Sequence, residues 1–152
     1  MLKKIFFIIL LITLLNNCDY KPVYSNQNKG NFKIIVMDFS GDKEINNIIA
    51  TNLSRNSRDN SDKIINISFD TKYKKNVLAK NTTGAITDYQ SVINSSFIIQ
   101  KENSSKNVLI SEKFNFQKMT DKYEEKNYEQ NIKRNLANSI AEKLILRLAI
   151  IE

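Results

Sequence analysis

Apolar positions recur along residues 32–150 with two spacings, and the spacing predicts the local structure. Residues 32–39 are mostly β-branched, aromatic or aliphatic, which is typical of a strand. Residues 65–73 alternate strictly between Ile, Phe, Thr or Tyr and polar side chains, as expected of a sheet with one wet face. Two further strands each place their apolar residues on one parity: Tyr89, Ile93, Phe97 and Ile99, then Val108, Ile110, Phe114 and Phe116.

Two segments carry helical spacing instead. Asp42 is a predicted N-cap for a helix that runs to about residue 55, with one buried stripe of Ile45, Ile48, Ile49 and Leu53. Thr120 and Asp121 precede a helix of some 30 residues that runs to about residue 150, with Glu124 in capping-box spacing. Its core positions repeat every four residues, namely Leu136, Ile140, Leu144 and Leu148.

The resulting order, β-α-β-β-β-α, predicts an α+β two-layer sandwich. Short connections favour a four-stranded, mostly antiparallel sheet, with the first strand joined through a helical crossover. Both helices are expected on one face, and the other face is expected to be polar and either wet or covered by a partner. Residues 103–107 predict the turn of a hairpin, and residues 80–84 predict a loop at the opposite end of the sheet.

The N-terminus predicts export and lipidation. Lys3 and Lys4 precede residues 5–15, of which ten are apolar, and a helix of that length rises only about 16 Å, too short to span a bilayer comfortably. We therefore predict a signal peptide over residues 1–17, a lipidated tether over 18–31 and a single domain over 32–152. Cys18 is the expected lipidation site, and its acyl chains would anchor the domain stably. An uncleaved anchor and a stray thiol are the alternatives.

Composition excludes several kinds of site. The chain has no His, one Cys, three Gly and one Pro, which rules out His-based catalysis, a disulfide framework and a glycine-rich phosphate loop. The formal net charge is +7, and 19 of the 23 basic residues are Lys, which holds phosphates as a point charge. We take six lysines as candidate anion-binding residues, with solvated strand ends as the alternative: Lys72, Lys74, Lys75, Lys80, Lys101 and Lys106. If the sheet is a meander, Lys80 lies at the opposite end from Lys101 and Lys106.

Residues 18–25, Cys-Asp-Tyr-Lys-Pro-Val-Tyr-Ser, resemble the opening of lipopolysaccharide-assembly lipoproteins of the LptE type. Tyr20, Lys21, Pro22, Val23 and Tyr24 match the aromatic, basic, proline, aliphatic and aromatic places of that opening. Asp19 replaces a small residue, Ser25 replaces a common glycine, and Asn17 replaces the small residue usual before the cysteine. The order and length of the predicted elements agree over the rest of the mature chain.

The resemblance implies an outer-membrane lipoprotein, anchored on the periplasmic side. Such proteins plug and help to assemble a β-barrel translocon of the LptD type, and they bind lipopolysaccharide without covalent chemistry. The six candidate lysines are therefore expected to bind the phosphates of lipopolysaccharide. We therefore expect no catalytic residues, no cofactor, no metal and no nucleic-acid partner. Asp19 counts against this address, because in enteric bacteria Asp there tends to retain lipoproteins in the inner membrane.

Three other functions compete with this interpretation. An enzyme would need a nucleophile and base, and the candidate carboxylates, Asp59 with Asp62 and Glu124 with Glu125, do not supply such a pair. A nucleic-acid-binding module could stack bases on Tyr73 beside Lys72 and Lys74, but an export signal argues against that partner. Another periplasm-facing lipoprotein, acting as an adaptor or inhibitor on the same fold, is the serious competitor.

Overall fold

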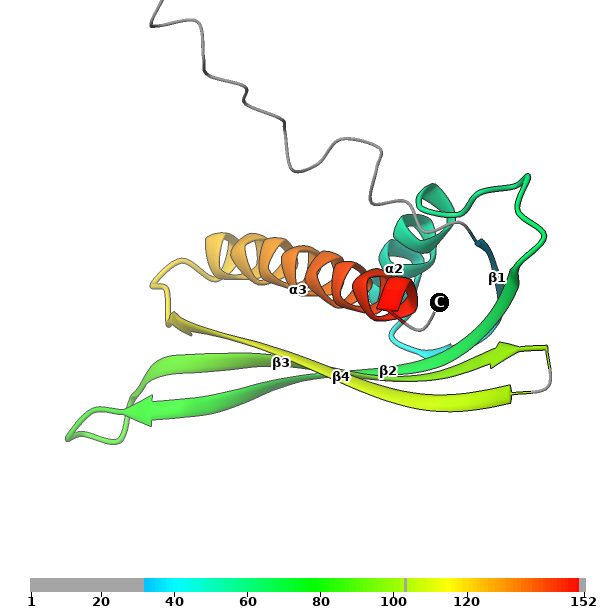
Figure 1. The fold of residues 1–152 in the computed structure, drawn as a ribbon. Coiled ribbons are helices and arrows are strands. Elements are labelled where there is room, and N and C mark those ends of the chain that lie inside the picture. Colours follow the sequence, from blue (N-terminus) through cyan, green and yellow to red (C-terminus); the bar gives the residue numbers. More distant parts are fainter. Residues whose placement is uncertain (1–31, 103, 151–152) are drawn as a thin grey trace, which may run out of the picture.

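A computed structural model describes residues 32–102 and 104–150 (Figure 1). The element order is β-α-β-β-β-α, as predicted, with bounds β1 Lys33–Gly41, α2 Lys43–Arg55, β2 Ile64–Lys80, β3 Ile86–Lys101, β4 Ser104–Gln117 and α3 Lys122–Ile150. The predicted signal peptide, the tether and Cys18 lie outside the described residues. Among the described residues, no helix combines the length and the hydrophobicity needed to cross a bilayer.

The four strands form one sheet in the order β1-β2-β3-β4. β1 pairs parallel with β2 because α2 carries the chain back between them, whereas β2 with β3 and β3 with β4 are antiparallel hairpins. Both helices lie on the same side of the sheet, and α3 runs along its length (Figure 1). The predicted α+β sandwich is therefore confirmed.

Local capping fixes where α2 begins. The Asp42 side chain accepts hydrogen bonds from the backbone N–H groups of Glu44 and Ile45 at 3.1 and 3.2 Å, so the predicted N-cap is confirmed. Asn46 is buried on the same helix, and its amide donates to the carbonyl oxygen of Ser40 at 2.8 Å and accepts from the Thr71 hydroxyl. These bonds satisfy the polar groups that the crossover buries.

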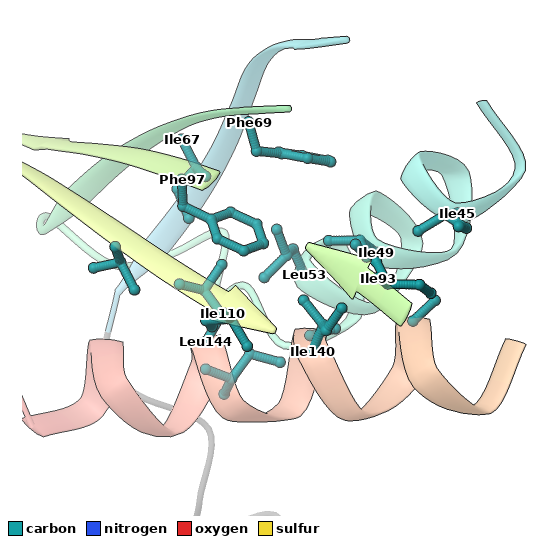
Figure 2. Packing of buried hydrophobic residues seen from close by; sticks show 14 of the residues in the cluster. Ile45, Ile49, Leu53, Ile67, Phe69, Ile93, Phe97, Ile110, Ile140 and Leu144 are labelled. Atoms are coloured by element: carbon teal, nitrogen blue, oxygen red, sulfur yellow. The ribbon is translucent and has the colours of Figure 1, made fainter. Parts of the chain in front are cut away.

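The core lies between the sheet and the two helices. The odd-numbered apolar side chains of β2 and β3 point toward the helices, and Figure 2 shows Ile93, Phe97 and Ile110 turned toward Ile140 and Leu144 of α3. Ala137 and Ala141 are fully buried in α3, and their small side chains let this helix approach its neighbours closely. The helical stripes and strand parities predicted from the sequence form this core.

Two local expectations are wrong, and one residue of a predicted core face is exposed. Residues 104–107 belong to β4, because the β3–β4 ladder runs on to the pair Lys101–Ser104 and its hydrogen bonds outweigh the turn preference of these residues. Phe114 lies on the same face of β4 as Val108, Ile110 and Phe116, as predicted, but it is 44% exposed, whereas Phe116 is buried against Tyr128 of α3. At the start of α3 it is Glu125, not Glu124, that reaches back, and it accepts a hydrogen bond from the backbone N–H of Met119 at 3.0 Å.

Candidate functional site

The sheet divides the candidate lysines between its two faces. Lys72 and Lys74 alternate with the buried Thr71 and the partly buried Tyr73 on β2, so they project from the face that the helices leave uncovered, here called the outer face. Lys74, Val92 and Lys113 are paired in one row across β2, β3 and β4. Two strand spacings place the backbones of Lys74 and Lys113 about 10 Å apart.

We call Lys72, Lys74 and Lys113 the sheet lysines. The Lys72 ammonium lies 3.8 Å from the Asp70 carboxylate, and their side chains are 73% and 40% exposed, so this contact is weak. Lys74 and Lys113 form no ion pair with any residue of the described ranges. Lys113 was missed by the sequence analysis, because its nearness to Lys74 depends on the strand register.

The surroundings of the sheet lysines are polar but mostly uncharged. The outer face is dominated by amide and hydroxyl side chains, among them Asn66, Ser68, Asn94, Ser96, Gln100, Ser105, Asn107, Ser111 and Asn115. Gln90 donates to Asn115 across two strands at 2.9 Å. Ile98 and Leu109 are exposed apolar side chains within this field, at 42% and 67%. Such a face can form many hydrogen bonds with a polar surface or with sugars.

Lys75 has a different role from its neighbours. It lies on the helix side of β2, where its ammonium donates to Glu125 at 2.8 Å and to Glu129 at 3.0 Å, and sits 4.1 Å from the centre of the Tyr89 ring. The Tyr73 hydroxyl donates to the second oxygen of Glu129 at 2.6 Å. This cluster joins the N-terminal half of α3 to the sheet, so the charge of Lys75 is already neutralised within the chain.

The pKa values in this cluster follow from its contacts. Burial raises the pKa of Tyr73, and the hydrogen bond to Glu129 raises it further. Burial alone would lower the pKa of Lys75, but its hydrogen bonds to Glu125 and Glu129 outweigh burial and raise it. The hydrogen bond from Lys75 lowers the pKa of Glu125. For Glu129, the hydrogen bonds from Tyr73 and Lys75 overcome burial and lower the pKa. Both carboxylates are therefore held in the charged form.

The remaining candidates lie at the two ends of the sheet. Lys80 pairs with Ile86 at one end, whereas Lys101 pairs with Ser104 at the other, so the expected separation of Lys80 from Lys101 and Lys106 is confirmed. Lys101 and Lys106 border a pocket of about 290 Å³ at the C-terminal end of α3. Four buried apolar residues form its wall: Phe32, Ile65, Ile99 and Leu148. The polar residues that complete it are Lys63, Lys101, Ser104, Ser105 and Lys106.

Within the part of the chain that the structure describes, no group of three or more His, Cys, Asp or Glu side chains is placed to hold a metal ion.

No protein-family model matches the chain, and no curated protein sequence matches it. Solved structures do match at the level of the fold. The rare lipoprotein B from Shewanella oneidensis superimposes with a TM-score of 0.62 at 12% identity, over 76% of this chain and 94% of that one. The minor lipoprotein from Acinetobacter baumannii gives 0.52 at 10% identity, over 76% and 92%. Lipoprotein B from Nitrosomonas europaea gives 0.51 at 12% identity, over 80% and 86%. The described domain therefore has the fold of these lipoproteins.

Proposed function

We propose that this chain is an outer-membrane lipoprotein that plugs and helps to assemble a β-barrel translocon of the LptD type, and that it binds lipopolysaccharide during delivery to the cell surface. It performs no covalent chemistry in this role. Three observations support the proposal: the fold likeness to lipoproteins, the cysteine that follows the apolar N-terminal run, and the resemblance of residues 18–25 to the LptE opening.

The outer face carries the proposal. A large barrel has a polar lumen, and the amide and hydroxyl groups of this face would hydrogen-bond with such a wall. The sheet lysines project from the middle of the same face, where they would contact the phosphates of lipopolysaccharide that moves along it. Lys75 is left out of this site because it is paired with Glu125 and Glu129.

The barrel partner is tested by co-purification of the full chain from detergent-solubilised outer membranes. We expect a barrel of the LptD type in the native pull-down and its loss in the double variant Asn94→Glu/Ser111→Glu, which puts two carboxylates on the outer face. The matched control, Asn47→Glu/Thr51→Glu, adds the same charge to exposed positions on α2 and should retain the barrel. A native pull-down without the barrel would favour the adaptor or inhibitor alternative.

Lipopolysaccharide binding is tested with the full chain and purified lipopolysaccharide. Exposed ion pairs contribute about 0.2–1 kcal/mol each, so Lys72→Gln/Lys74→Gln/Lys113→Gln should weaken binding roughly tenfold. The control removes the same charge from exposed helix positions, as Lys43→Gln/Lys122→Gln/Lys126→Gln. Equal loss in both variants would mean that net charge alone drives binding and that the outer face is not the site.

The anchor is tested separately. Cys18→Ser should abolish incorporation of labelled palmitate, because this is the chain's one cysteine. Unchanged incorporation in the variant would refute the lipidation site.

A further inference from the structure

The pocket at the C-terminal end of α3 has the chemistry of a site for one lipid chain. Its wall is made of Phe32, Ile65, Ile99 and Leu148, which are at most 5% exposed and belong to different parts of the fold. Its volume of about 290 Å³ is near the lower end of the range for small-molecule sites, so it has room for a stretch of one acyl chain rather than for several chains.

The rim of this pocket selects for negative charge. Lys101 and Lys106 form no ion pair with any described residue, and no carboxylate of the described residues lines the pocket. A wider depression of about 910 Å³ at the opposite end of α3 differs in charge, because Asp88 and Glu125 line it together with Lys118 and Lys122. Apolar walls below two ammonium groups match an amphiphile that has an acyl chain and an anionic head.

The length of the predicted tether favours the membrane as the source of that amphiphile. Phe32 belongs to the wall, and the 14 residue steps from Cys18 to Phe32 can extend at most about 50 Å. If Cys18 carries acyl chains, the pocket stays within that distance of the membrane surface. This step rests on the lipidation of Cys18, but not on a barrel partner or on lipopolysaccharide.

We propose that this pocket binds one acyl chain of an anionic phospholipid from the anchoring membrane, with the phosphate held between Lys101 and Lys106. The chain lies against the apolar wall, and the headgroup stays at the surface. The domain would thereby be held against the membrane by a second, non-covalent contact, on the opposite side of the sheet from the sheet lysines.

The test uses the full lipidated chain in phosphatidylcholine nanodiscs that contain phosphatidylglycerol with a photoreactive diazirine on one acyl chain. After illumination, mass spectrometry should find adducts on the peptides that contain Ile65, Ile99 or Leu148. Lys101→Gln/Lys106→Gln should lower this labelling at least tenfold, because the loss of even one charge-assisted hydrogen bond weakens binding about tenfold. Lys122→Gln/Lys126→Gln, which removes the same charge elsewhere on the domain, should label as the native chain does.

Two further arms separate the possible ligands. Phosphatidylcholine with the same photoreactive chain should label the pocket several-fold less, because its headgroup has no net charge. Lipid A with a photoreactive chain should label it no more than phosphatidylglycerol does. Absence of pocket adducts in the native chain, labelling that is insensitive to Lys101→Gln/Lys106→Gln, or stronger labelling by lipid A would each overturn the proposal. An unchanged unfolding midpoint in the double variant shows that lost labelling is not lost folding.

Discussion

Truncation of Leu144 measures how much the contact between α3 and the sheet contributes to stability. Leu144 is fully buried, and Figure 2 shows its side chain next to Ile110 of β4. Leu→Ala changes at well-packed sites lower the free energy of unfolding by about 2.7–5.0 kcal/mol. The cost combines the lost free energy of burying the Leu side chain with the cost of the cavity that remains. We expect Leu144→Ala to lower the free energy of unfolding by about 3 kcal/mol. At about 4 °C per kcal/mol for a domain of this size, Tm should fall by roughly 12 °C.

Leu146 supplies the matched control on the same helix. It is 57% exposed, two positions away on the opposite side of α3, so Leu146→Ala should change the free energy of unfolding by less than about 0.5 kcal/mol. Leu144→Asp should be more damaging than Leu144→Ala, because a carboxylate would be buried without a partner.

The assay is denaturant unfolding of the full chain followed by circular dichroism, with Tm measured in parallel. The two alanine variants should keep the native slope of unfolding free energy against denaturant concentration. A shifted midpoint then reports a change in stability alone. Equal midpoints for Leu144→Ala and Leu146→Ala would refute the assignment of this face of α3 to the core.

Two further predictions concern the backbone and the ion-pair cluster. Gly41 has φ +94°, and a Cβ there would overlap the backbone of Thr71, so Gly41→Ala should lower the free energy of unfolding by several kcal/mol in a denaturant titration. Gly84 also has a positive φ but has open space around it, so Gly84→Ala should cost only about 1 kcal/mol. Similar costs for the two variants would contradict the close approach of Gly41 to Thr71. The pKa values of Glu125 and Glu129 are lowered in the folded chain, so their contribution to stability is complete above the unfolded pKa of about 4.3 and is lost as the pH falls below it. A plot of Tm against pH for Glu129→Gln should therefore lose part of this acid dependence. A plot parallel to that of the native chain would refute a stabilising role for the Glu129 carboxylate.

Much of the fold could be predicted because its determinants are local. The alternation from Ile65 to Tyr73 depends only on the period of a strand, and the spacing from Leu136 to Leu148 depends only on the period of a helix. The N-cap at Asp42 is equally local, since its side chain bonds to N–H groups two and three residues away. The extent of the β3–β4 ladder was not predictable in this way, because pairing with a neighbouring strand overrode the turn preference of residues 104–107.

The candidate site shows the opposite case. Residue type and charge indicated that lysines could bind anions, and the alternation of side chains along a strand places Lys74 and Lys75 on opposite faces of the sheet. Three relations depend on the folded arrangement. Lys113 lies near Lys74, and Lys75 is paired with two carboxylates of α3. Phe32 and Leu148 share a pocket wall with Ile99. The reason is geometric: spacing along a strand or helix is set by the covalent chain, whereas distance between elements depends on register and on how the core packs.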